Sequence, residues 1–312
     1  MRFTVVRSPL VGRLTFMNGC MVRVPFRDLV PAVSAAGFEA MTCWANVWRH
    51  ALTRDGFDLP GMKALLDDNG VALTDCEVCR TWAPSAAETA SGMPVVAADP
   101  HEILSVCAAL GGSTVVAIHD TPDGLVLDRD AEAFAALCDA AAEHGLRVAL
   151  ETVPFTTIRD VASGWSLVDA AGRPNGGLVF DVWHHVRSGC PDSALDQVPG
   201  SRIFTIQLSD GPANPRTIDL MAEASTPQGR MAPGAGEMPV SRLLSLLRAK
   251  GVVANVGPEV TLTVDGGALD RERAEALARE LHQATTSTLA AADARSAERL
   301  EYRRAELRGA ER

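Results

Sequence analysis

One continuous stretch decides the fold class: STVVAIHDTPDGLVLDRDAEAFAALCDAAAEHGLRVALETVP, residues 113–154. It opens with a nearly continuous apolar run and closes with a second one at 146–150. Between them, from Phe134 to Ala141, apolar residues recur at the three- and four-residue spacing of a helix with one buried face. A buried strand, an amphipathic helix and another buried strand form the repeating unit of a parallel sheet covered by helices.

The same order of apolar run and helical segment recurs along the chain. The other runs are LTFMNG (14–19), EAMTCW (39–44), VALTDCEVCRTW (71–82), GLVFDVWHH (177–185), RIFTIQLSD (202–210) and VVANVGPEVTL (252–262). About eight such units predict an α/β protein folded as a single (β/α)8 barrel, a fold that typically takes about 250 residues. A doubly wound open sheet is less favoured, because the first strand lacks a glycine-rich phosphate loop. We expect residues 1–285 to form the barrel and 286–312 to form a C-terminal helical extension or tail.

The composition narrows the range of partners. The 312 residues carry a formal net charge of −10, which argues against binding to nucleic acid or to an anionic membrane surface. The chain has no stretch that approaches the about 20 apolar residues needed to span a bilayer, and its N-terminus lacks the pattern of a signal peptide. The seven cysteines are scattered, as expected for free thiols in a reducing compartment. We therefore expect a cytoplasmic protein whose partner is a small molecule.

Several of the later apolar runs turn polar at their ends. The polar residues at these ends are Glu151, Asp181 with His184 three residues on, Gln207, and Glu259. Because the carboxyl ends of barrel strands meet at one mouth, these side chains should converge there. Three carboxylates would repel one another at such a place unless a cation lay between them. Glu151, Asp181, Gln207 and Glu259 offer only oxygen ligands, a set that suits one ion of Mg²⁺ or Mn²⁺.

These elements, in this order, resemble the xylose isomerase-like TIM barrels, the superfamily of the sugar phosphate isomerases and epimerases. In its epimerase branch strand five ends in a metal-binding Glu, as ALETVP does with Glu151. Strand six ends in D-x-x-H, as FDVWHH does with Asp181 and His184. Strand eight ends in a second metal-binding Glu, which Glu259 in VGPEV matches. The resemblance covers roughly residues 150–260.

The region between strands seven and eight fits the resemblance with one departure. Arg230 precedes PGAGEMPV, as an arginine precedes P-G-x-G in the family, and IQLSD stands where strand seven usually reads "vHvkD". Gln207 therefore occupies the place of a metal-binding His, and in this respect it resembles the 3-dehydroshikimate dehydratases of the superfamily. A second departure is Val153, which stands where many relatives have a histidine.

The resemblance implies an enzyme that depends on one divalent ion, Mn²⁺, Mg²⁺ or Co²⁺. The implied activity is isomerisation or epimerisation of a small polyhydroxylated carbonyl compound, a sugar or a keto-polyol, through a metal-stabilised enediolate. The alternative is a metal-dependent dehydratase, a lyase, that acts on a cyclic keto-polyol such as 3-dehydroshikimate or an inosose. A barrel that binds a ligand without catalysis is less favoured, and the net charge disfavours the nuclease branch of the superfamily. Because dimers and tetramers are common in this superfamily, the resemblance also implies a homo-oligomer.

Each candidate site residue receives a role. The predicted catalytic residues are His184, Glu151 and Glu259. His184 is included because its spacing of three residues from Asp181 would let its ring reach past the ion towards a substrate oxygen. The predicted substrate-binding residues are Arg230, Glu237, His119 and Trp44. Arg230 suits an anionic group, Glu237 a substrate hydroxyl or its own loop, and an aromatic face can lie against a sugar ring. Each of three residues could instead have a purely structural role. His184 could be hydrogen-bonded behind the site, Arg230 could lie on a surface loop, and His119 could lie at the rim of the barrel.

Overall fold

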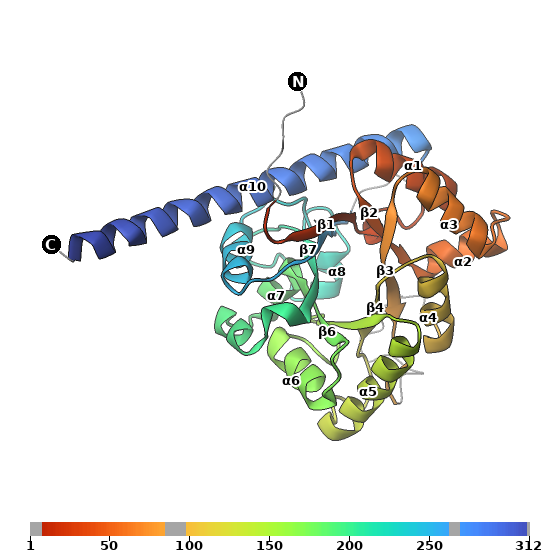
Figure 1. The fold of residues 1–312 in the computed structure, drawn as a ribbon, viewed down its shortest axis with the longest axis horizontal. Coiled ribbons are helices and arrows are strands. Elements are labelled where there is room, and N and C mark those ends of the chain that lie inside the picture. The colour runs from red at the N-terminus through yellow and green to blue at the C-terminus, as the bar shows by residue number, and fades with distance from the viewer. Residues whose placement is uncertain (1–7, 85–97, 262–268, 311–312) are drawn as a thin grey trace.

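Eight parallel strands close into a barrel in the order β1 to β8 in the computed structural model, which describes residues 8–84, 98–261 and 269–310, with side chains as far as 297 (Figure 1). The strands are β1 (Val11–Phe16), β2 (Ala40–Trp44), β3 (Ala72–Cys79), β4 (Thr114–Ile118), β5 (Arg147–Glu151), β6 (Gly176–Asp181), β7 (Ile203–Leu208) and β8 (Ala254–Pro258). This confirms the predicted (β/α)8 barrel. No helix of the described residues is long and apolar enough to cross a membrane.

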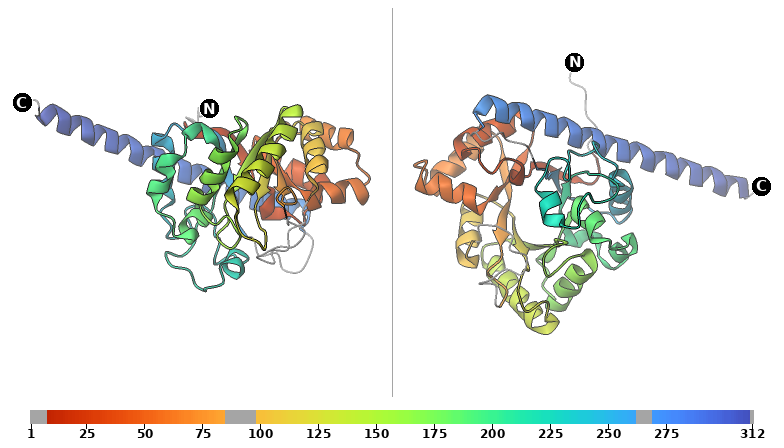
Figure 2. Two further views of the ribbon diagram at one scale, coloured as in Figure 1. Left: turned by 90° about the horizontal axis from the view of Figure 1, so that it is seen from below. Right: turned by 180° about the vertical axis from the view of Figure 1, so that it is seen from behind.

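Helices surround the barrel on its outer face (Figures 1 and 2). The α-helices are α1 (Phe26–Ala36), α2 (Ala45–Thr53), α3 (Leu59–Asp68), α4 (Pro100–Ala109), α5 (Leu127–Glu143), α6 (Val161–Ala171), α7 (Val182–Ser188), α8 (Leu220–Ala224), α9 (Val240–Ala249) and α10 (Arg271–Ala310). Three short 3-10 helices are η1 (Asn18–Met21), η2 (Asp192–Gln197) and η3 (Gly200–Arg202). The strands read as continuous apolar runs because the helices cover the outer face of the sheet and side chains fill its interior.

The helix used to decide the fold class begins earlier than its sequence pattern indicates. The apolar spacing begins at Phe134, whereas α5 begins at Leu127. The reason is that Asp130 Oδ2 accepts a hydrogen bond from the backbone N–H of Val126 at 2.8 Å, which satisfies a donor at the start of the helix. The helix ends before Gly145, whose φ of 70° is the left-handed conformation expected of a glycine after a helix.

Barrel closure depends on a glycine in the last strand. β8 pairs with β1 in parallel, with Leu14 opposite Val256. A Cβ atom added at Gly257 would lie 1.7 Å from the carbonyl oxygen of Thr15, so β1 and β8 can approach only because residue 257 has no side chain. Two residues further on, Glu259 reaches the mouth from this tightly packed strand.

The predicted C-terminal extension is helical. α10 packs against α1 and α9 and reaches well beyond the barrel as a single helix (Figures 1 and 2). The predicted division between 285 and 286 lies within this helix, and the separation into a barrel and an extension stays a prediction. The expectation of free thiols is met, because all seven cysteines are unpaired.

Candidate metal centre

Three side chains from neighbouring elements converge at the carboxyl end of the barrel. Glu151 ends β5, Asp181 ends β6, and His184 lies in the first turn of α7. Each offers one ligand atom, these atoms lie within 4.8 Å of one another, and all three residues are buried. Asp181 Oδ1 accepts the backbone N–H of His184 at 2.8 Å, so the same carboxylate ends the strand and caps the helix. The local sequence therefore fixes where His184 lies relative to Asp181.

Gln207 stands beside this group. β6 and β7 pair with Asp181 opposite Gln207, which brings the amide to the level of the carboxylates. Gln207 is fully buried, and neither its Oε1 nor its Nε2 has a hydrogen-bond partner among the described residues. A buried amide without partners is costly, and a divalent ion is one group that could engage its oxygen. This orphaned amide fits the predicted role of Gln207 as a ligand.

Arg230 links the fourth predicted ligand to the others. Its Nη2 donates to Asp181 Oδ2 and, at 2.8 Å, to Glu259 Oε2. The three side chains are 11%, 1% and 8% exposed, so the guanidinium lies almost out of solvent between two carboxylates. Burial works against the charge of Arg230, but Asp181 and Glu259 hold its pKa above the ordinary value. The guanidinium thus supplies the positive charge between these two predicted ion ligands.

A fourth carboxyl group, that of Glu77, lies close enough to Glu151 and Glu259 to interact with their charges. Glu77, on β3, is buried, and its burial together with the charges of Glu259 and Glu151 raises its pKa well above the ordinary value. Burial also raises the pKa of Glu259 to about 7, although Arg230 opposes this shift. Because the raised pKa keeps Glu77 protonated near neutral pH, the negative charge that a divalent ion can neutralise comes from Glu151, Asp181 and Glu259, which outnumber the one arginine. The residues present therefore fit an ion of the Mg²⁺ or Mn²⁺ class.

His184 is held towards Glu151. Its Nδ1 lies 3.3 Å from Glu151 Oε1. Burial lowers the pKa of His184, but the charges of Asp181 and Glu151 outweigh burial and raise it above the ordinary value. A histidine in this position can hold a proton close to the carboxylates.

Trp44 borders the metal centre from β2. A Cβ atom at Gly19 would lie 2.9 Å from Glu259 Oε1 and 3.0 Å from the Trp44 ring, so the carboxylate and the ring flank the same glycine. The backbone N–H of Trp44 donates to Asn18 Oδ1 at 3.0 Å, which ties the end of β2 to η1. The sequence reasoning did not single out Gly19; its place directly after the polar Asn18, where the first strand ends, was the available signal.

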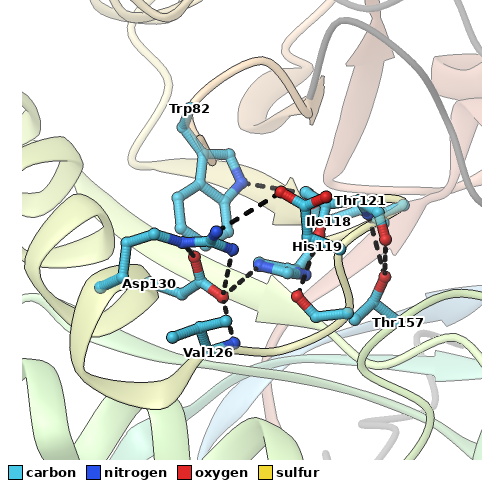
Figure 3. Close-up of polar contacts among 10 residues, drawn as sticks. Trp82, Ile118, His119, Thr121, Val126, Asp130 and Thr157 are labelled. Atoms are coloured by element: carbon cyan, nitrogen blue, oxygen red, sulfur yellow. Dashed lines mark hydrogen bonds and ion pairs between the residues drawn. The ribbon is translucent and has the colours of Figure 1, made fainter. Parts of the chain in front are cut away.

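His119 lies in a different contact (Figure 3). Its Nε2 is 3.1 Å from Asp130 Oδ2 on α5, and its ring packs edge-on against Trp82 with centroids 5.4 Å apart. Trp82 in turn donates its indole N–H to the carbonyl oxygen of Ile118 at 3.0 Å. Burial lowers the pKa of His119 despite the nearby Asp130. The contacts described for His119 thus tie β4 to α5 rather than reach the metal centre.

Glu237 lies on the loop that follows Arg230. It is exposed, its Oε2 accepts the backbone N–H of Ala213 at 3.1 Å, and its own N–H donates to the carbonyl oxygen of Gly211 at 2.8 Å. These contacts hold one part of the long β7–α9 connection to another. The structure therefore groups Glu151, Asp181, His184, Gln207, Arg230, Glu259 and Trp44, and places His119 and Glu237 in contacts outside that group.

Proteins of known function and a protein-family model resemble this chain. Residues 30–284 match the family model of the xylose isomerase-like TIM barrel. An inosose isomerase from Bacillus velezensis is 31% identical over 156 residues, which is 48% of this chain and 54% of that protein. A 3-dehydroshikimate dehydratase from Pseudomonas putida is 28% identical over 116 residues, 37% of this chain and 18% of that protein. The chain thus matches about half the length of the inosose isomerase and less of the dehydratase.

Solved structures show the same fold. The IolI protein with a zinc atom superposes with a TM-score of 0.71 and 19% identity, covering 90% of this chain and 97% of that chain. An L-ribulose 3-epimerase superposes with a TM-score of 0.68 and 17% identity, covering 92% of this chain and 97% of that chain. At these identities the likeness shows the fold, and the chemistry has to be argued from the residues of the site.

Proposed function

Because the chain belongs to the xylose isomerase-like TIM barrel family, we propose that it is a divalent-metal-dependent enzyme that isomerises or epimerises a small polyhydroxylated carbonyl compound. The observation that carries the proposal is the buried group of Glu151, Asp181 and His184, beside the unpartnered amide of Gln207. Similarity to inosose isomerases over half of their length supports a sugar-like substrate.

The residues of the chain divide the work. Glu151, Asp181, Gln207 and Glu259 would hold the ion. When bound, such an ion polarises a substrate carbonyl and makes the neighbouring C–H more acidic. A carboxylate then takes the proton, and Glu259, whose pKa burial raises to about 7 in the ion-free site, is the candidate for this step. His184, held against Glu151, can deliver a proton to a substrate oxygen.

Arg230 and Trp44 would fix the substrate. The guanidinium lies within reach of both Asp181 and Glu259, so it can bind a substrate oxygen beside those carboxylates. The Trp44 ring, which flanks Gly19 together with Glu259, offers an apolar face against which a sugar ring can pack. We also propose roles in substrate binding for His119 and Glu237, through the loops that they hold.

A second candidate is dehydration of a cyclic keto-polyol such as 3-dehydroshikimate or an inosose. Gln207 favours it, as does the similarity to 3-dehydroshikimate dehydratases. The first step is the same removal of a proton next to the carbonyl. The bond to the β-hydroxyl then breaks, a double bond forms, and His184 protonates the leaving oxygen so that water departs.

The test starts with metal-stripped protein reloaded with Mn²⁺, Mg²⁺ or Co²⁺. It is incubated in D₂O with inososes, ketohexoses and 3-dehydroshikimate, and the products are followed by NMR and mass spectrometry. An isomerase or epimerase places deuterium on the reacting carbon and keeps the molecular formula otherwise unchanged, whereas a dehydratase removes one water. Glu151→Gln should abolish both reactions, and Glu143→Gln on the exposed end of α5 should abolish neither. If the protein binds the ion but neither exchanges deuterium into any of these substrates nor turns them over, the proposed activity is wrong and the barrel binds a ligand without catalysis.

We further propose that the protein acts in the cytoplasm as a homo-oligomer. Its mass in solution, measured by size-exclusion chromatography with light scattering, tests whether it is a homo-oligomer. A monomeric mass at micromolar concentration contradicts it.

A further inference from the structure

A buried cluster lies directly behind Arg230. It consists of Trp183 and Arg187 on α7, Glu223 on α8, and Gly229, the residue before Arg230; we call it the Trp183 cluster. Its ion pair joins Arg187 Nη2 to Glu223 Oε1 at 2.8 Å, and the two side chains are only 2% and 1% exposed. In a pair buried this deeply, the free-energy cost of desolvating the two charges often exceeds the gain from their attraction, so the pair seldom adds stability. We therefore ask which residues it positions.

The contacts of the cluster lead to Arg230. The indole N–H of Trp183 donates to the carbonyl oxygen of Gly229 at 2.8 Å. Two guanidinium groups lie over the Trp183 ring, with Arg187 Cζ 5.5 Å and Arg230 Cζ 5.9 Å from its centroid. A Cβ atom at residue 229 would lie 2.1 Å from the carbonyl oxygen of Glu223, so Gly229 allows the segment before Arg230 to pack on α8.

The cluster is also fixed to the predicted ion ligands. Trp183 and Arg187 belong to the helix that Asp181 caps, so the ligand and the cluster move as parts of one helix. Arg187 Nη2 also donates to the carbonyl oxygen of Pro212 at 2.9 Å, which ties α7 to the connection after β7. The result is a continuous path of contacts from Glu223 through Arg187 and Trp183 to the guanidinium of Arg230.

We propose that Glu223 and Arg187 are positioning residues, which hold the Arg230 guanidinium on Asp181 and Glu259 and thereby set the affinity of the centre for its ion. This inference rests on the proposed function, because it takes Asp181 and Glu259 as ligands. The guanidinium and a divalent ion compete for the same carboxylate oxygens, so each displaces the other. Loosening Arg230 should therefore strengthen ion binding, whereas damage to a merely structural pair would weaken it or leave it unchanged.

The experiment measures Mn²⁺ binding to the metal-stripped full chain by isothermal titration calorimetry. Glu223→Gln keeps the shape of the side chain and removes its charge; it should bind Mn²⁺ at least about fivefold more tightly than the wild type. Arg230→Met should tighten binding by at least as much. In the double variant, Glu223→Gln should add nothing to Arg230→Met, because a positioning residue acts only through the residue that it positions.

A control and a second design separate positioning from loss of fold. Asp130→Asn removes the charge of another buried, ion-paired acid, on α5, and should lower the melting temperature without changing the Mn²⁺ affinity. If Glu223→Gln does not fold, Arg187→Met combined with Glu223→Leu removes both buried charges together and should show the same tightening.

The outcomes are distinct. Unchanged or weaker Mn²⁺ binding in the folded Glu223 variants overturns the inference, and so does an effect that is fully additive with Arg230→Met. If the wild type binds no Mn²⁺, the proposed function and this inference fall together. If Mn²⁺ binds with the expected pattern but no substrate is turned over, the inference stands and the proposed activity fails.

Discussion

Replacing Arg230 by Met should destabilise the metal-free protein strongly. The guanidinium bridges Asp181 and Glu259, and all three side chains are at most 11% exposed. Removing one partner from a buried ion pair costs about 3–5 kcal/mol, because the remaining charges stay buried without a counterion. For a chain of this size, with about 2 °C per kcal/mol, that loss corresponds to a fall in melting temperature of about 6–10 °C in EDTA.

The loss should depend on pH in one direction. Burial raises the pKa of Glu259 to about 7 from 4.5, so its buried charge costs stability as pH rises through this range, and at pH 5 the group is largely protonated. Arg230 opposes this shift, so without Arg230 the pKa rises further. The difference between wild type and variant should therefore be smaller at pH 5, where the contact of Arg230 with Asp181 is left, than near pH 8, where both contacts contribute.

The assay is urea unfolding in EDTA, followed by circular dichroism, at pH 5 and pH 8. Arg248→Met, which breaks the partly exposed ion pair with Asp293, is the matched control and should cost no more than about 1 kcal/mol. Excess Mn²⁺ should then restore more stability to the Arg230 variant than to the wild type. The reasoning is refuted if the Arg230 variant lies within 1 kcal/mol of the wild type at pH 8, or if its loss is equal at both pH values.

Three further perturbations have defined outcomes. Gln207→Leu should make the metal-free protein more stable by about 1–3 kcal/mol, because it removes a buried amide that has no hydrogen-bond partner within the described parts of the chain. The same variant should weaken Mn²⁺ binding in calorimetry by at least about tenfold; equal affinity would show that the amide is no ligand. Gly257→Ala should cost more than about 4 kcal/mol in urea unfolding, since its Cβ would meet the Thr15 carbonyl oxygen at 1.7 Å, and near-wild-type stability would contradict this packing. Burial raises the pKa of Asp75, on β3, to about 6. Wild-type stability should therefore fall relative to Asp75→Asn by about 2.5 kcal/mol as pH rises from 4 to 8, and parallel pH curves would argue against it.

The sequence was sufficient for the barrel and for the residues at its later strand ends. Eight apolar runs alternating with helical segments admit few other arrangements, and the structure confirms the closed barrel. Glu151 and Asp181 could be placed at one mouth because parallel strands end on the same edge of a sheet. The structure also brings His184 to them, through the capping of α7 by Asp181. These are local relations, in which strand ends and helix starts fix where a side chain lies.

Other placements depended on packing between distant segments. Sequence position put His119 at a strand end like the others, but its ring pairs with Asp130 on the following helix. Arg230 was expected to bind an anionic group of the substrate, which stays a proposal, and the structure adds its contacts with Asp181 and Glu259.

The sequence by itself therefore determined the barrel and the edge of the sheet at which the acidic side chains gather, because hydrophobic period and strand direction are properties of each segment. Only the tertiary structure decided which positive group faces those acids. That choice depends on the Trp183 indole N–H meeting the Gly229 carbonyl oxygen and on the ion pair behind it, contacts between residues about 40 positions apart that no local pattern encodes.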